Sequence, residues 1–148
     1  MNLEWKIKRF EALSIKELYN LLQLRSEVFV VEQNCVYQDI DGKDLKALHL
    51  FGEDDGKIVA YSRLFNVGDY FENASIGRVV VAENCRNKSY GHDLMREAIS
   101  AIENQFQETK ITISAQLYLK KFYEEQGFVK SGDMYYEDEI EHIPMIRA

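Results

Sequence analysis

The stretch VVVAENCRNKSYGHDLM, Val79 to Met95, decides the fold that we predict for this chain. It passes from a β-branched run, typical of a buried strand, through a polar turn into apolar residues at helical spacing. It contains neither the glycine pattern of dinucleotide-binding folds nor the Gly-Lys-Ser/Thr of a P-loop. The free amides and partial positive charge at a helix start favour an anion, and Arg86 and Lys88 add positive charge. The stretch therefore predicts an anion site, with a solvated strand–helix turn as the alternative.

A strand, a helix and an antiparallel hairpin are predicted before this stretch. Residues 3–10 alternate in part between polar and apolar side chains, as in a strand. Ser14 and Glu17 have the spacing of a capping box, and apolar residues at helical spacing follow them. Residues 45–68 read as two strands around an Asp-Asp-Gly turn, and residues 74–82 as a third strand of the same sheet.

Two helices and three strands are predicted from the turn onward. The helical pattern that begins at Ser89 runs to Phe106, and residues 110–115 are short and β-branched, as in a buried strand. Residues 116–128 read as a second amphipathic helix with Gly127 as its stop, and two strands around an acidic loop follow. The helix between the fourth and fifth strands would be a crossover, so the sequence predicts a mixed α/β sheet that is antiparallel at first.

Length and charge limit the class of protein. A chain of 148 residues with predicted elements nearly from end to end fits one domain, and we expect that domain to span residues 1–148. The net charge of −7 argues against non-specific binding of nucleic acid. It would instead favour the approach of cationic substrates.

The cysteines and the hydropathy pattern indicate the compartment. Cys35 and Cys85 form no Cys-x-x-Cys pair and have no clustered histidines, so we expect reduced thiols and no metal site. Residues 1–13 contain no apolar signal-peptide core, and no run of about 18 apolar residues occurs. These features predict a cytoplasmic protein without a membrane partner.

The opening stretch resembles the strand and pyrophosphate turn of the GCN5-related N-acetyltransferase (GNAT) superfamily. Residues 117–128, LYLKKFYEEQGF, resemble the recurring Phe-Tyr-Glu-x-x-Gly-Phe helix end of that family, at a fitting distance. Residues 24–50, 75–81 and 141–145 are similar to its ElaA-like branch, so the resemblance covers about residues 14–148. It implies an α/β (α+β) fold, with a mixed, mostly antiparallel sheet of six to seven strands flanked by helices.

The resemblance also implies a cofactor, acetyl-CoA, and the residues that bind it. The pantetheine arm would pair with main-chain groups of the fourth strand, and the pyrophosphate with amides of the turn and helix start. One position departs from the family, because Ser89 stands where glycine is expected and crowds the ligand more. Gln116 lies near the place where many family members have an asparagine that meets the cofactor. The implied cofactor residues are Val79, Val80, Val81, Arg86, Asn87, Lys88, Ser89, Tyr90, Gly91, His92 and Gln116.

Three residues are candidates for proton transfer. In the family, the tyrosine of the Phe-Tyr-Glu motif acts as a general acid toward the departing thiolate, and here that residue is Tyr123. A phenol with a pKa of about 10 suits this role, and a core tyrosine is the alternative. An amine must lose a proton to attack the thioester, so Glu32 and His142 are candidates for the base. The alternative for Glu32 is substrate binding or the capping of backbone amides, and the alternative for His142 is a structural role.

Two arginines are candidates for the acceptor side of the site. Arg25 lies on or beside the apolar face of the first helix, and Arg78 interrupts an apolar strand. Buried arginines need partners, so we expect both in ion pairs, with Glu32 or a nearby aspartate, that line the acceptor pocket. The acidic residues 135–141 are a charged loop by default, and could also select a polyamine or a lysine-like group.

The main hypothesis is an enzyme that moves an acetyl group from acetyl-CoA to a primary amine of a small molecule or peptide. A CoA-binding module with little or no catalysis is the first alternative, suggested by Ser89 and by the lack of an unambiguous base. A synthase that uses S-adenosylmethionine is the second, because LRSEVFVVEQ, residues 24–33, shares features with such lactone synthases. The acceptor does not follow from the sequence. Members of the family often pair through sheet edges, which makes a homodimer an open expectation.

Overall fold

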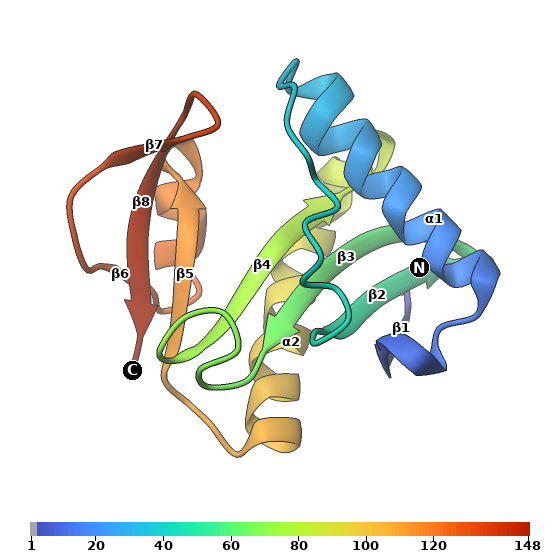
Figure 1. Cartoon of the computed structure of the whole chain (residues 1–148), viewed down its shortest axis with the longest axis horizontal. Helices are drawn as coiled ribbons and strands as arrows, with labels where there is room; N and C mark the ends of the chain where they lie inside the picture. Colours follow the sequence, from blue (N-terminus) through green and yellow to red (C-terminus); the bar gives the residue numbers. More distant parts are fainter. Residues whose placement is uncertain (1–2) are drawn as a thin grey trace.

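A computed structural model describes residues 3–148, which form one mixed sheet with helices on both faces (Figure 1). Within these residues the sheet has eight strands, in the order β1-β2-β3-β4-β5-β8-β6, and β7 also pairs with β8. All neighbours are antiparallel except β4 and β5. The strands are β1 (Glu4–Arg9), β2 (Leu48–Asp54), β3 (Lys57–Phe65), β4 (Ala74–Val81), β5 (Ile111–Gln116), β6 (Val129–Lys130), β7 (Tyr135–Glu137) and β8 (Ile140–Arg147).

The helices and helical turns lie in three stretches of the chain, between β1 and β2, between β4 and β5, and between β5 and β6. The predicted domain limits begin at residue 1, and residues 1 and 2 lie outside the described part of the chain. The α-helices are α1 (Ile15–Arg25), α2 (Tyr90–Phe106) and α3 (Lys120–Glu124), and the shorter or irregular turns are η1 (Phe10–Ala12), η2 (Ser26–Glu32), η3 (Glu83–Lys88) and η4 (Leu117–Leu119).

The local signals read from the sequence are confirmed at α1 and at the first hairpin. The Ser14 hydroxyl accepts from the Glu17 amide at 3.0 Å, and the Glu17 carboxylate accepts from the Ser14 amide at 2.9 Å. This reciprocal cap satisfies two amides that would otherwise face water unpaired. Asp55 and Gly56 between β2 and β3 both have positive φ, 51° and 81°, as a two-residue hairpin turn requires.

The chain after β5 differs in two details from the sequence prediction. Residues 116–128 do not form one helix, because Gln116 is extended and Leu119, at ψ 7°, interrupts the turns, leaving η4 and the short α3. Gly127 has φ 95° and ends this segment, as predicted. The last part of the chain contains three strands rather than two, since β6 and β7 pair with different ends of β8.

Two clusters of buried side chains hold the helices to the opposite faces of the sheet. The larger cluster joins Leu94, Met95 and Ile102 of α2 to β2, β3, β4, β5 and β8. The smaller joins Leu21 and Leu24 of α1 to the other face of β2, β3 and β4. The crossover by α2 places β4 and β5 side by side in parallel, as the sequence predicted.

Candidate active site

The two parallel strands at the centre of the sheet diverge. β4 and β5 pair only at Ala74 with Ile111 and at Ser75 with Thr112. Beyond these pairs the strands separate toward the carboxyl end of β4, which Figure 1 shows as the widening angle between them. The edge of β4 from Ile76 to Val81 therefore has no strand partner on the β5 side, and an unpaired strand edge can pair with an extended ligand.

A bulge shapes this edge of β4. Tyr61 and Arg63 of β3 pair with Val80 and Gly77, so one residue of β3 faces two residues of β4. Arg78 lies in the bulge with φ 49°, a conformation that costs energy for a residue with a side chain. Such bulges bend a strand and re-aim its side chains. Here the bend lies where β4 leaves β5.

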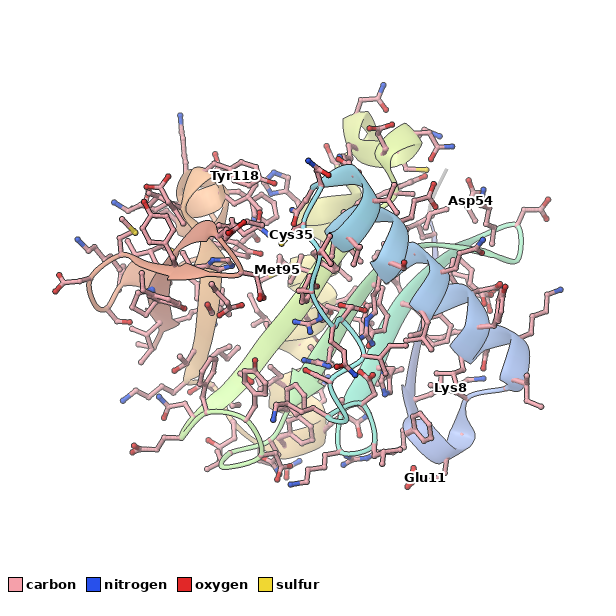
Figure 2. All side chains as sticks on the ribbon, turned by 45° about the horizontal axis from the view of Figure 1, so that its top comes forward. Lys8, Glu11, Cys35, Asp54, Met95 and Tyr118 are labelled. Atoms are coloured by element: carbon pink, nitrogen blue, oxygen red, sulfur yellow. The ribbon has the colours of Figure 1, made fainter. Side chains whose placement is uncertain are left out.

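A cavity of about 460 Å³ occupies the space between the diverging strands. Its walls come from η2 and the segment that follows it, the free edge of β4, η3 and the start of α2, the end of β5, η4 and α3, and the β7–β8 hairpin. Cys35 and Tyr118 mark two of these parts in Figure 2. The wall contains ten predicted site residues, which are Glu32, Arg78, Val79, Val80, Val81, Arg86, Gly91, Gln116, Tyr123 and His142.

The start of α2 lies at one end of the cavity. Ser89 precedes the helix in a left-handed conformation, φ 61° and ψ 20°, and no side chain caps the first amides. Glycine adopts this conformation without cost, which explains the family's preference at this position. A Cβ atom at Gly91 would lie 3.4 Å from the Phe122 ring, an ordinary van der Waals contact, so this part of α2 packs beside α3.

Two of the predicted site residues form an ion pair with each other. The two terminal nitrogens of the Arg86 guanidinium, Nη1 and Nη2, contact the Glu32 carboxylate, and Nη2 lies 2.7 Å from Oε1. The third nitrogen, Nε, donates to the Val81 carbonyl at 3.1 Å. The hydrogen bonds from Arg86 lower the pKa of Glu32, which makes that carboxylate a poor proton acceptor. Both side chains are partly exposed, so an anion from solvent could take the place of Glu32.

The other predicted cofactor residues lie around the turn rather than in the cavity wall. Asn87, Lys88 and Ser89 are exposed, while the Tyr90 side chain is buried in the larger cluster, so only its main chain faces outward. His92 bonds to Gln126 at 2.7 Å and packs on the Phe122 ring.

The Tyr123 side chain is 6% exposed and lies in the cavity wall. Its hydroxyl makes no hydrogen bond to the described residues, although its ring packs against Phe122 and Phe128. Burial, and to a smaller degree Tyr118, raises the pKa of this hydroxyl, which keeps it protonated at neutral pH. A buried donor without a partner can give its proton to a ligand in the cavity.

The end of the cavity at the β7–β8 hairpin holds His142. Its Nδ1 lies 2.8 Å from the carbonyl of Ile140, and since a carbonyl only accepts, Nδ1 carries the hydrogen. The lone pair of the neutral ring is therefore on Nε2. Gln116 pairs with His142 in the β5–β8 ladder, and its amide exchanges hydrogen bonds of 3.2 and 3.4 Å with Gln33.

Arg25 lies outside the cavity wall, in what we call the buried ionic cluster, formed by Arg25, Asp39, Asp41, Asp44, Arg63 and Arg78. The Arg25 side chain has no exposed area and contacts Asp39 at 2.9 Å and Asp44 at 2.8 Å. The predicted aspartate partners of Arg25 are thus present. The prediction that Arg25 lines the pocket is corrected, because its side chain does not reach the cavity wall. The neighbouring Arg78 does reach the cavity, and it contacts Asp39 at 2.7 Å.

The buried ionic cluster fixes the segment between η2 and β2. Arg63 donates to both oxygens of Asp41, and these bonds lower the pKa of Asp41 to about 2 although burial opposes the shift. The Tyr37 hydroxyl donates to Asp39 at 2.9 Å, and the Arg78 guanidinium lies over the Tyr37 ring. Tyr37 is therefore held in the cavity wall by Asp39 of the same segment and by Arg78 of β4.

Sequence reasoning missed several residues of the cavity wall. They are Val28, Phe29, Gln33, Cys35, Tyr37, Ile76, Gly77, Ile113, Ser114, Tyr118, Leu119, Phe122, Glu137, Asp138 and Ile140. Two of them, Glu137 and Asp138, belong to the acidic residues 135–141 that the sequence suggested for acceptor selection. No local signal separates the others from ordinary core or loop residues, because they meet only after the sheet has formed.

Divergent parallel strands, a bulged central strand and an uncapped helix start therefore meet at one cavity. In a comparison with known families, the model of the acetyltransferase (GNAT) domain matches residues 14–148. The chain belongs to the GNAT acetyltransferase family, and within it to the ElaA-like branch.

Two relatives illustrate how close this likeness is. The protein ElaA of Escherichia coli K12 is 41% identical over 147 residues, which cover 98% of this chain and 96% of ElaA. The crystal structure of E. coli ElaA superposes with a TM-score of 0.91, over 99% of each chain. An acyl-CoA N-acyltransferase from Pseudomonas aeruginosa superposes with a TM-score of 0.92 at 44% identity, again over 99% of each chain. The chain thus has the family and the fold of the acyltransferases.

The side-chain clusters and the helices of the described residues bear on metal binding and on membrane insertion. Across residues 3–148, no group of three or more His, Cys, Asp or Glu side chains is arranged to hold a metal ion. In the same part of the chain, no helix has the length and apolar character needed to cross a bilayer.

Proposed function

We propose that this chain transfers an acetyl group from acetyl-CoA to a primary amine by direct attack of the amine on the thioester. The observation that carries the proposal is the cavity itself. Its wall brings together Arg86 and Gly91 of the turn and helix start, the unpaired edge of β4, and His142. A helix start suits a pyrophosphate, and a free strand edge suits the extended amide-containing pantetheine arm.

The residues of the first half of the cavity fit this cofactor. The main chain of Val79, Val80 and Val81 would pair with pantetheine, and amides between Arg86 and His92 would hold the pyrophosphate. The Arg86 side chain would add a cationic contact by releasing Glu32. When bound, acetyl-CoA supplies an activated thioester carbonyl for the amine to attack.

Tyr123 and His142 would carry the protons. The Tyr123 hydroxyl is buried, protonated and without a hydrogen-bond partner among the described residues, so it would protonate the departing sulfur. The Nε2 atom of His142 would accept a proton from the amine. Glu32 is the weaker candidate for the base, because Arg86 engages both of its oxygens and lowers its pKa.

The proton balance of this scheme closes. An amine that arrives as an ammonium ion gives one proton to His142, which passes it to solvent. The nitrogen then forms its bond to the carbonyl carbon, the carbon–sulfur bond breaks, and Tyr123 protonates the sulfur. The second proton lost by the nitrogen restores Tyr123, so each turnover releases one proton.

A CoA-binding module without catalysis is the second candidate. Ser89 in the position of a family glycine and Glu32 in contact with Arg86 both favour it, because each opposes cofactor binding in the productive place. A donor such as S-adenosylmethionine is less well supported, since the family match covers residues 14–148, including the pyrophosphate turn.

Thermal unfolding and thiol release test the proposal together. Acetyl-CoA at about 100 times its dissociation constant should stabilise the protein by roughly 2.7 kcal/mol. A panel of small amines, antibiotics and peptide N-termini should then release free thiol from acetyl-CoA. A thermal shift without thiol release for any amine would favour the binding module, and no shift at millimolar CoA would reject the cofactor.

The proposal also includes the compartment, the acceptor class and the oligomeric state of the protein. Cys35 and Cys85 are both free thiols, which fits the predicted cytoplasmic compartment. The acceptor would be a small-molecule or peptide amine, and neither nucleic acid nor membrane is part of the proposed activity. A homodimer through a sheet edge stays a prediction.

A further inference from the structure

The end of the cavity at the β7–β8 hairpin has an unpaired basic nitrogen. The His142 side chain is 8% exposed, and its Nδ1–H donates to the Ile140 carbonyl. The remaining nitrogen, Nε2, lies in the cavity wall and makes no hydrogen bond to any group of residues 3–148. The Tyr135 ring stacks on the imidazole, with 5.9 Å between centroids, and keeps the imidazole in this orientation.

A carboxylate faces the same nitrogen. The Oε2 atom of Glu137 lies 3.9 Å from Nε2 of His142, and its Oε1 atom lies 3.4 Å from the Ser114 hydroxyl. The first distance is too long for a hydrogen bond. It is short enough for one nitrogen of a ligand to donate to both atoms, because an ammonium carries several N–H groups that point in different directions.

The charges around this end of the cavity are not balanced. The two cations of the cavity wall are already paired, Arg78 with Asp39 and Asp41, and Arg86 with Glu32. Neither Glu137 nor Asp138 has a lysine or arginine partner among the described residues. Asp138 and Glu139 also hold positive φ values, 51° and 67°, in the tight turn that presents these carboxylates. An end of this kind attracts a cation and repels a carboxylate.

We propose that this end of the cavity binds the acceptor as an aliphatic ammonium ion, held between the Glu137 carboxylate and Nε2 of His142. The inference rests on the proposed function and names its substrate class. It selects aliphatic primary amines, which are charged in solution, over neutral aromatic amines and over amines that carry a carboxylate next to the nitrogen. Glu137 binds the charge, and His142 then removes one proton.

Two sources share this chemistry, a free diamine and the side chain of a lysine in a peptide. Both present an unhindered primary ammonium on a flexible alkyl chain. The test therefore uses putrescine and a short lysine peptide with blocked termini as separate probes, with p-anisidine as the neutral amine and glycine as the amine that carries a carboxylate.

Binding is measured by titration calorimetry on the full chain saturated with CoA, which lacks the acetyl group and cannot react. Putrescine or the lysine peptide should bind, and Glu137→Gln should weaken that binding by about tenfold or more, because a charge-assisted contact is lost. Glu139→Gln is the matched control, since it removes the same charge from the same turn but from outside the cavity wall. It should change binding less than Glu137→Gln does.

His142→Gln separates binding from proton transfer. It should keep the thermal shift with CoA, which also shows that the variant folds, and should lower the turnover number far more than it weakens amine binding. Equal binding by Glu137→Gln and wild type would overturn the inference. Tighter binding of p-anisidine or glycine than of putrescine and the peptide, or no binding of either cation at millimolar concentration, would overturn it as well.

These results are distinct from a failure of the proposed function. Glu137-dependent binding of the cation without acetyl transfer would leave the inference standing and reject the enzyme. Acetyl transfer that does not depend on Glu137 would leave the enzyme standing and reject the inference.

Discussion

The buried ionic cluster and the cavity wall both contain arginine–carboxylate pairs, but the pairs differ in how far they are exposed. In the cluster, Arg25 and Arg63 share the Asp44 carboxylate at 2.8 and 3.0 Å, and the arginine side chains are at most 1% exposed. In the cavity wall, the Arg86 pair with Glu32 is about one-third exposed or more on each side, at 41% and 32%. Tyr123 and His142 there each keep a polar atom without a hydrogen-bond partner in residues 3–148, and both residues line the cavity, whereas the unpartnered Nε of Arg63 in the cluster is enclosed.

This difference separates structure from function within one charge-rich region. A buried charge that loses its partner is costly, so the cluster is fixed and can only support the fold. An exposed ion pair contributes little to stability, so Arg86 can change partners at small cost. Arg78 belongs to both regions, because Asp39 holds it in the cluster while its side chain reaches the cavity.

The largest expected effect is the loss of stability when the cluster is broken. Asp44→Asn removes the charge that Arg25 and Arg63 share, and we expect the free energy of unfolding to fall by about 3 kcal/mol. Urea unfolding followed by circular dichroism measures the change. Asp133→Asn, at an exposed position, is the control and should change stability little. A loss below about 1 kcal/mol for Asp44→Asn would show that the cluster contributes no more to stability than a network of exposed ion pairs does.

A smaller effect, on rate rather than stability, is expected from the unpaired hydroxyl of the cavity wall. Tyr123→Phe should lower the turnover number by about 100-fold while leaving the dissociation constant of CoA unchanged, because only proton donation is lost. Thiol release with an active amine measures it. Tyr136→Phe, an exposed tyrosine of the β7 strand, is the control. Unchanged turnover in Tyr123→Phe would remove this residue as the acid.

The exposed ion pair should affect affinity more than stability. Arg86→Gln removes the cationic contact with the pyrophosphate, and we expect CoA to bind about tenfold more weakly. The free energy of unfolding should change by less than about 1 kcal/mol, in contrast to Asp44→Asn. Arg96→Gln on the exposed side of α2 is the control. If Arg86→Gln destabilised the protein as much as Asp44→Asn does, the two regions would not differ in kind.

The smallest effect concerns the two left-handed residues that flank α2, Ser89 at φ 61° and Gln107 at φ 55°. Glycine at either position relieves backbone strain, so Ser89→Gly and Gln107→Gly should each change stability by no more than about 1 kcal/mol. Only Ser89→Gly should also tighten CoA binding, by a few-fold, because it removes a side chain from the pyrophosphate turn. Calorimetric titration of both variants compares them directly, and an equal change in CoA affinity would contradict the role of position 89.

Much of the fold was predictable because its signals are local. The Ser14 cap, the Asp55–Gly56 turn and the stop at Gly127 each depend on a few neighbouring residues, and all three are confirmed. The helix predicted over residues 116–128 was wrong in its extent. Its apolar spacing fits a helix, but Gln116 is held in the β5–β8 ladder and cannot join one.

The candidate site was predictable only in its first half. The strand, turn and helix start from Val79 onward are contiguous in sequence, so one motif marks them. The acceptor end joins Tyr37, Ser114 and Glu137, which come from three distant segments and carry no shared pattern. Arg25 illustrates the reverse error, because a buried arginine near a site and a buried arginine in a closed cluster look alike in sequence.

The sequence by itself determined the order of strands and helices as far as β5, the crossover between β4 and β5, and the basic turn at the start of α2. Periodicity, capping and turn chemistry act over a few residues, and they are written in the chain. Only the tertiary structure decided how far β4 and β5 stay paired, which arginines are enclosed, and which polar atoms face the cavity. Those outcomes depend on contacts between residues far apart in sequence, such as Gln33 with Gln116 and Glu32 with Arg86.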